Sequence, residues 1–234
     1  MRVQSFYEWN ARKRVRNVSV SPHWRYSEDL LCRSGDSAMC ALGVDVGGRR
    51  KGFDVAIVDE RRLLDLRGGL DRSAVVAIVE DVRPVIIGID GPRSCAPEGY
   101  SARACERQLA RAICGIRWTP DERRVRAGAY YEWVVEALAL FDALTARRVQ
   151  AVEVFPTASW TRWCGPRGTR SRSSWTREGL ASLPLEGVPQ RTNQDQRDAI
   201  AAALTARQHA SGQTESIGEI VVPRLRGRGY SEPR

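Results

Sequence analysis

The stretch "ALGVDVGGRRKGFDVAIVDERRLL", residues 41–64, decides the expected fold of this chain. Two runs rich in β-branched residues, 41–46 and 53–60, flank a segment that begins with two glycines. Strand-forming runs on either side of such glycines predict a β-hairpin. Asp45 lies near the end of the first strand, and a buried carboxylate is costly unless something pairs with it. The stretch therefore predicts a hairpin whose acid needs a partner: a metal ion, a phosphate-bound metal or a neighbouring basic residue.

Strand-like and helix-like segments alternate through the rest of the chain. The run 83–92 is short and apolar without alternation, as in a central parallel strand, and Asp90 stands near its end. The other strand-like segments are 61–69, 151–156 and 219–225. Segments with helical spacing are 71–82, 101–114, 129–148 and 193–211, whereas 157–192 is loop-like. This order predicts a mixed α/β fold around one central sheet.

Length and composition suggest how the chain is divided. Its 234 residues, 42% of them hydrophobic, suffice for one large folded domain. We expect this domain over residues 39–225, with a Trp- and Arg-rich insertion at about 157–192. Residues 1–38 are polar, basic and aperiodic, so we expect a disordered arm or an upstream extension there, and a flexible tail at 226–234. Neither a membrane-length apolar run nor a signal-peptide core is visible, so we expect a cytoplasmic protein.

The formal net charge of +9 is carried almost entirely by arginine, because Lys13 and Lys51 are the only lysines. A basic balance favours polyanionic partners such as nucleic acid. A genomic base composition that replaces lysine by arginine is the other interpretation, and the charge alone does not separate the two. The six cysteines form no CxxC pair, and only His23 and His209 could assist them, so we do not expect a zinc site.

Three carboxylates stand at places that favour a shared site. Asp45 and Asp90 each close an apolar strand, and Asp198 follows Asp195 by three residues on the last helix. Sheets of this kind bind ligands beyond the carboxyl ends of their strands. Carboxylates gathered there repel one another unless a cation neutralises them, and oxygen-only ligands suit Mg²⁺ or Mn²⁺. We therefore predict a metal site at Asp45, Asp90 and Asp198; a turn cap is the alternative for the first two, and Glu153 and Asp195, taken singly, are interpreted as structural.

The motifs also resemble a known family. The first hairpin resembles that of ribonuclease H-like nucleases, including RuvC-type Holliday-junction resolvases. More specifically, the chain resembles the domain-of-unknown-function 429 family in "GVDVGG", "VIIGIDGP", "RACERQLAR", "EVFPTASW" and "DQRDAIAAALTA", in this order, with "IVVP" near the end. That family is described as predicted nucleases. The resemblance covers residues 41 to about 223 and implies a ribonuclease H-like fold, with a mixed central sheet flanked by helices.

The resemblance implies metal ligands at Asp45, Asp90 and Asp198, with Glu153 as a further catalytic acid. Further candidates for the site are Arg103, Glu106 and Asp195. The expected activity is hydrolysis of phosphodiester bonds with two ions, Mg²⁺ or Mn²⁺, held about 4 Å apart. Asp45 would bridge the ions, and Asp90 and Asp198 would hold one each.

The segment 157–179 has a composition of its own, because tryptophans alternate with arginines and no acid precedes Glu178. Arginine for phosphate and tryptophan for base stacking favour a nucleic-acid surface. The alternative is that the tryptophans pack a long excursion onto the domain and the arginines solvate it. The predicted nucleic-acid-binding residues are Arg49, Lys51, Trp160, Arg162, Trp163, Arg170 and Arg172. The sequence does not separate DNA from RNA.

Two other function classes remain open. "DVGG" resembles the phosphate loop of the sugar kinase and acetate kinase superfamily, which predicts a phosphotransferase, although those enzymes normally carry two such halves and this chain has room for one. No Walker A motif and no GxGxxG after a strand is present. The second alternative is a non-catalytic module that binds nucleic acid and keeps the basic loop without needing the acids.

Overall fold

The computed structural model describes residues 40–225, so the expectations for residues 1–38 and 226–234 lie outside the described residues. Its centre is a seven-stranded sheet with the order β3-β2-β1-β4-β5-β7-β6. The strands are β1 (Ala41–Val46), β2 (Phe53–Val58), β3 (Leu63–Leu70), β4 (Ile86–Asp90), β5 (Ala151–Val154), β6 (Thr214–Ile217) and β7 (Ile220–Pro223).

The strand directions confirm the predicted hairpin and the predicted central strand. β1 and β2 are antiparallel, and β2 pairs with β3 in the same way. β4 lies between β1 and β5 and is parallel to both. This order and these directions, with helices on both faces, are those of a ribonuclease H-like fold, so the predicted fold class is confirmed. The hairpin of β6 and β7 was not predicted, although Gly218, with φ +59°, and Glu219 form a two-residue connection of the kind that joins paired strands.

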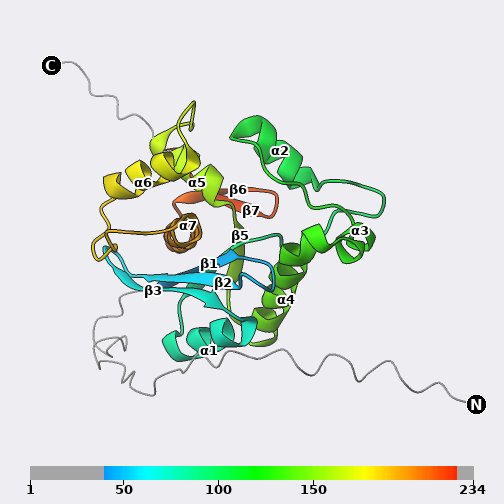
Figure 1. Cartoon of the computed structure of the whole chain (residues 1–234), viewed down its shortest axis with the longest axis horizontal. Coiled ribbons are helices and arrows are strands. Elements are labelled where there is room, and N and C mark those ends of the chain that lie inside the picture. The colour runs from blue at the N-terminus through cyan, green and yellow to red at the C-terminus, as the bar shows by residue number, and fades with distance from the viewer. Residues whose placement is uncertain (1–39, 226–234) are drawn as a thin grey trace, which may run out of the picture. The chain divides into compact units, whose positions relative to one another are not determined.

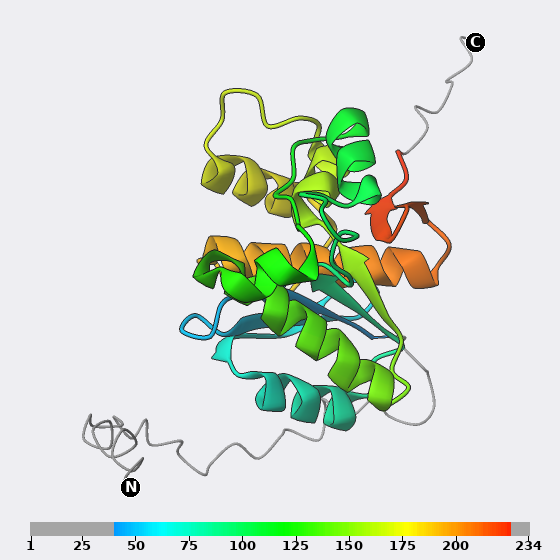
Figure 2. The same ribbon diagram turned by 90° about the vertical axis from the view of Figure 1, so that its right-hand side faces the viewer.

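The helices cover the two faces of the sheet. They are α1 (Arg72–Val82), α2 (Ala104–Ala112), α3 (Glu122–Ala127), α4 (Glu132–Ala146), α5 (Pro156–Cys164), α6 (Arg172–Ser182) and α7 (Gln194–Ala210), with a 3₁₀ turn, η1 (Ala129–Tyr131), before α4. Figures 1 and 2 show α7 lying across one face of the sheet, with α1 and α4 on the other. Within residues 40–225 no helix combines the length and the apolar character needed to cross a membrane.

The position of α7 depends on two glycines and a run of alanines. Gly43 and Gly88 are register partners on β1 and β4, beneath the helix. A Cβ at Gly43 would lie 2.1 Å from backbone atoms of α7, and one at Gly88 would lie 2.4 Å from another. The small side chains of residues 199–203, four of them alanines, are buried against the strands. This close approach brings the first turn of α7 over the strand ends that carry Asp45 and Asp90.

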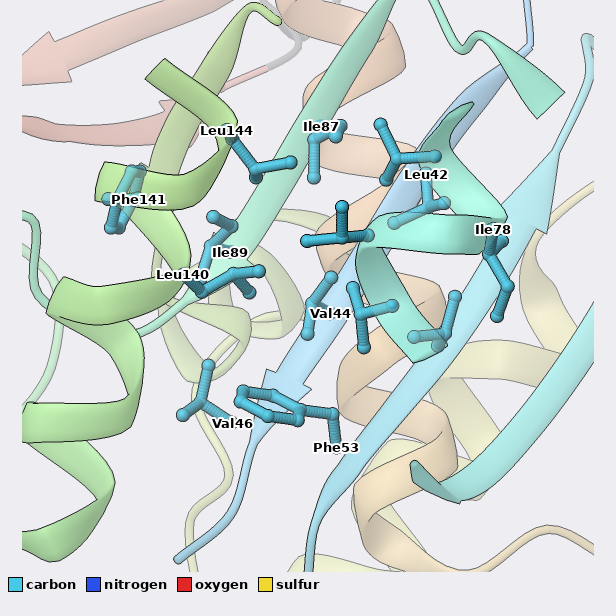
Figure 3. Packing of buried hydrophobic residues seen from close by; sticks show 14 of the residues in the cluster. Leu42, Val44, Val46, Phe53, Ile78, Ile87, Ile89, Leu140, Phe141 and Leu144 are labelled. Atoms are coloured by element: carbon cyan, nitrogen blue, oxygen red, sulfur yellow. The ribbon is translucent and has the colours of Figure 1, made fainter. Parts of the chain in front are cut away.

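The opposite face holds a core of larger side chains, which keeps the sheet rigid behind the site. Branched and aromatic residues from the three central strands pack against α1 and α4. Figure 3 labels Leu42, Val44, Val46, Phe53, Ile87 and Ile89 from the sheet, Ile78 from α1, and Leu140, Phe141 and Leu144 from α4.

The expectation that 157–192 is loop-like is wrong, because α5 and α6 occupy most of it. Pro156 was taken as the end of a strand, whereas it is the first residue of α5, where a missing N–H costs nothing. Ser171 caps α6, since its Oγ accepts a hydrogen bond from the backbone N–H of Ser174 at 3.0 Å. Trp160 and Trp175 are fully buried against the strands and α7. The segment is therefore part of the domain core.

Candidate active site

The strand register gathers three of the acids on one face of the sheet. Asp45 on β1 is the partner of Asp90 on the parallel strand β4 and of Asp54 on the antiparallel strand β2. Residues directly opposite each other on neighbouring strands point to the same face. That face carries α7, whose first two turns add Asp195 and Asp198. The predicted grouping of Asp45 and Asp90 with the acids of the last helix is thus present in the structure.

Asp198 is held in place by four hydrogen bonds from three donor side chains. Gln194 Nε2 lies 3.0 and 3.1 Å from its two carboxylate oxygens, and Trp160 Nε1 donates at 3.4 Å. Arg172 Nη2 donates to Oδ2 at 2.9 Å from the first turn of α6. Asp198 is therefore oriented by the segment that was expected to be a loop.

Lys51 supplies a second positive charge to the cluster from the β1–β2 turn. Its Nζ lies 3.3 Å from Asp45 Oδ2 and 2.7 Å from Asp195 Oδ1. Burial lowers the pKa of this ammonium, but the hydrogen bond to Asp195 and the charge of Asp45 outweigh burial, so the pKa is raised. The Lys51 ammonium thus lies between the carboxylates of Asp45 and Asp195.

The cluster still lacks positive charge. Burial raises the pKa of Asp45 to about 7, against the charge of Lys51 and with added repulsion from Asp198. Burial and the charge of Asp45 raise the pKa of Asp90 well above its usual range. Burial also raises the pKa of Asp198, although Arg172 opposes the rise. The basic side chains among the described residues therefore do not fully compensate these carboxylates.

The donor set fits a divalent ion. One carboxylate oxygen each from Asp45, Asp54 and Asp195 lie within 4.8 Å of one another. An all-oxygen set of acids is the preference of Mg²⁺ and Mn²⁺. Asp54 was missed in the sequence, yet a signal was available: in the hairpin "GVDVGGRRKGFDV" the two aspartates stand at mirror positions about the turn.

The acids line a cavity of about 830 Å³. One part of its wall carries Asp45, Asp90, Asp195 and Asp198 with Lys51 and Arg172. Other parts carry Trp133, Phe155, Ile116 and Thr119, together with Arg103, Glu106 and Glu153. The acid cluster therefore forms one part of the wall of a larger cavity.

Glu153 is not brought into the acid cluster. It is the register partner of Ile89, so it points to the face opposite that of Asp90. Arg103 donates to its two oxygens at 2.5 and 2.7 Å, and the Arg93 backbone N–H donates at 2.8 Å. Glu106 accepts from Arg103 Nε at 3.0 Å. The further candidates Arg103 and Glu106 thus form a buried ion-pair network with Glu153, and the role of Glu153 as a catalytic acid stays a prediction.

The expectation that Trp160 and Trp163 stack on bases is wrong for Trp160, which is fully buried, and unsupported for Trp163, which is half-buried with Nε1 on Gln208. Arg162 pairs with Glu215, and Arg170 pairs with Glu178 at 3.4 Å. Packing of α5 and α6 against the rest of the domain accounts for the positions of these tryptophans.

Four of the predicted basic contacts remain accessible, which are Arg49, Lys51, Arg170 and Arg172. Arg49 is exposed beside Glu132 and Glu136, while Lys51 and Arg172 line the cavity. They stay predicted nucleic-acid contacts.

An exposed aromatic and basic surface lies elsewhere, around α3. Tyr100, Trp118 and Tyr130 are 56%, 49% and 63% exposed. The segment around α3 also carries exposed arginines, which are Arg117, Arg123, Arg124 and Arg126, and the last two pair with Asp121 at 3.7 Å and with Glu122 at 2.6 Å. The signal was present in the sequence as "RWTPDERRVRAGAYY", residues 117–131, which mixes arginines and aromatics much as 157–179 does.

Comparisons with known proteins give a family and a pair of similar structures. The model of a family described as "Protein of unknown function (DUF429)" matches residues 43–220. No curated protein matches the chain. Two RuvC structures from Thermus thermophilus are similar, each at 16% sequence identity and covering 74% of this chain. One covers 97% of the RuvC chain with a TM-score of 0.43, and the other, in complex with a Holliday junction substrate, covers 96% with a TM-score of 0.42.

Proposed function

This chain belongs to the DUF429 family of proteins of unknown function, and we propose that it is a metal-dependent nuclease that hydrolyses phosphodiester bonds. The observation that carries the proposal is the gathering of Asp45, Asp90, Asp195 and Asp198 in one cavity, with Asp54 beside Asp45 and Asp195; among the described residues, Lys51 and Arg172 are the basic side chains that pair with these acids. A cluster with this excess of buried carboxylate is stable in its charged form only with added cations.

Asp45 would be the shared ligand, because it neighbours both Asp54 and Asp90 in the strand register. Asp90 and Asp198 would complete one side of the site, and Asp54 and Asp195 the other. Bound Mg²⁺ or Mn²⁺ would supply Lewis acidity toward a phosphodiester and its attacking water. No histidine lines the cavity within residues 40–225, so the carboxylates would accept the released proton.

Lys51 and Arg172 are placed to bind the substrate phosphate. Each donates to a carboxylate of the cluster, and each lines the cavity. Both side chains are about half-exposed, so they can transfer their hydrogen bonds to a phosphate oxygen without a change in the fold. The arginine guanidinium also matches phosphate geometry in a bidentate way.

We further propose that nucleic acid contacts the surface around α3. Arg117 and Thr119 line the cavity, so the segment 117–131 runs from the cavity wall to the exposed Trp118 and Tyr130. Exposed aromatics beside arginines suit a single strand, since bases stack on the rings while guanidinium groups bind phosphates. These aromatics would take the stacking role expected of Trp160, which is buried.

The test is a cleavage panel of labelled single-stranded DNA, duplex DNA, RNA, hybrid and branched junction, in Mg²⁺, Mn²⁺ or EDTA. Asp45→Asn should abolish cleavage, whereas Asp142→Asn, a matched change of an exposed acid on α4, should leave it unchanged. Cleavage that persists in Asp45→Asn would place the activity elsewhere. Salt-sensitive binding without cleavage would favour the binding module, and metal-dependent ATP turnover would favour the phosphotransferase.

A further inference from the structure

Two polar atoms in the wall of the cavity have no hydrogen-bond partner among residues 40–225. They are Thr119 Oγ1 and Trp133 Nε1, and both are buried. Thr119 as a whole is 1% exposed. Buried hydroxyl and indole N–H groups almost always have a partner, so each exception needs an explanation. Both residues line the cavity that holds the acid cluster, so a local side-chain adjustment would bring these buried atoms to a ligand there.

The position of Thr119 is fixed by its backbone and leaves its hydroxyl free. The Thr119 N–H donates to both carboxylate oxygens of Glu106, at 3.0 and 3.1 Å. Glu106 is itself held by Arg103, from both the backbone N–H and Nε at 3.0 Å. The hydroxyl is therefore presented from a rigid support, and it can act as donor or acceptor. Trp133 stands in the first turn of α4 and adds a donor on a flat apolar ring.

The size and chemistry of the cavity match one nucleotide. Its volume of about 830 Å³ lies in the range of roughly 300–1,000 Å³ that small-molecule sites occupy. Lys51 and Arg172 suit a phosphate, and the rings of Trp133 and Phe155 with Ile116 suit a base. The unpartnered groups of Thr119 and Trp133 suit the polar edge of that base or its sugar.

We propose that the cavity binds a single nucleotide of an unpaired strand, with hydrogen bonds from its base or sugar to Thr119 Oγ1 and Trp133 Nε1. This inference deepens the proposed function and rests on it for the position of the phosphate beside the acids. A nucleotide in this cavity is out of any base stack. The preferred substrate class is therefore a single-stranded end or a displaced strand.

The test is nucleotide binding measured by calorimetry on the full chain. The probes are the four nucleosides in EDTA and the corresponding 5′-monophosphates in Mg²⁺, each as ribose and deoxyribose forms. Loss of one hydrogen bond in Thr119→Val or Trp133→Phe should weaken binding about 5- to 30-fold. Thr145→Val, which removes an exposed hydroxyl from α4, should bind as the wild type does. The ribose and deoxyribose series show which sugar the site accepts.

Thermal unfolding separates a ligand-binding hydroxyl from a structural one. Thr119→Val loses no internal hydrogen bond, so its Tm should equal or exceed that of the wild type. A lower Tm with unchanged nucleotide affinity would give the hydroxyl a structural role and overturn the proposal. Absence of nucleotide binding by the wild type would overturn it too, whatever the cleavage panel shows. Nucleotide binding that is weakened in Thr119→Val, without cleavage of any nucleic acid, would support the nucleotide subsite. The same result would contradict the proposed nuclease activity.

Discussion

Replacing Asp45 by asparagine should stabilise the metal-free protein at alkaline pH. The carboxylate is 7% exposed, and burial with the charge of Asp198 raises its pKa to about 7 despite Lys51. Because this folded-state pKa lies above the unfolded value, the carboxyl group favours folding below about pH 4, and this contribution is lost as the pH rises through about 7. The amide keeps the shape of the side chain and does not titrate.

The magnitude follows from the size of the pKa change. A rise from 3.8 to about 7 corresponds to roughly 4 kcal/mol at pH 8, at about 1.4 kcal/mol per unit. The attraction of Lys51 is already included in this net rise, and relief of Asp90 from the charge of Asp45 would add to the gain. Incomplete hydrogen bonding of the buried amide offsets about 1–3 kcal/mol. We expect a net gain of about 1–3 kcal/mol in the free energy of unfolding at pH 8, or a Tm higher by roughly 3–10 °C.

Thermal and urea unfolding in EDTA at pH 5 and pH 8 measure this effect, followed by titration with Mg²⁺. The wild type should lose stability between the two pH values and regain it with Mg²⁺, whereas Asp45→Asn should respond weakly to both. Asp142→Asn is the control for removing an exposed acid. If Asp45→Asn is less stable than the wild type at pH 8 in EDTA, the carboxylate is a structural partner of Lys51 and the metal interpretation of the cluster fails.

Two further substitutions test the packing of α7 on the sheet and the buried ion pair of Arg103 with Glu153. Gly43→Ala should lower the free energy of unfolding by about 1–3 kcal/mol, since its methyl group meets the α7 backbone, while Gly115→Ala, with open space, should be neutral in urea unfolding. Arg103→Met should cost about 3–5 kcal/mol in the same assay, because Glu153 keeps a buried charge without its partner. Adding Glu153→Leu to Arg103→Met should restore much of that loss; a double variant as unstable as the single one would argue against the ion pair as the cause.

The central part of the fold was predictable because its signals are local. β-Branched runs around the glycines of 47–52 specify the hairpin, and a short unpatterned apolar run specifies β4. Once these two strands are parallel neighbours, Asp45 and Asp90 must stand side by side, since both close their strands. The position of Asp198 followed from helical spacing on α7 and its packing over those strand ends.

The rest of the site depends on tertiary partners that no local pattern encodes. Trp160 has the same neighbours in sequence whether it stacks on a base or packs under α6, and only the packing of α5 on α7 decides between them. Arg103 and Glu153 are fifty residues apart, so their pairing becomes visible only when α2 is placed beside β5. Thr119 carries no sequence signal, because its proposed role depends on the lack of a hydrogen-bond partner for its hydroxyl within residues 40–225.

The two groups of buried acids in one cavity differ in how their charges are satisfied, and this difference bears on which group would bind the proposed metal ion. Glu153 and Glu106 receive hydrogen bonds from the Arg103 guanidinium and from backbone N–H groups at 2.5–3.1 Å. For Asp90 no N–H donor is found within residues 40–225, and burial, followed by the charge of the neighbouring Asp45, raises the pKa of its carboxyl. Arg103 neutralises one acid pair, whereas the other pair has the half-exposed Lys51 on Asp45 and no donor on Asp90 among the described residues. This difference supports our proposal that a cation from solution binds at Asp45 and Asp90 rather than at Glu153, which lines another part of the same cavity.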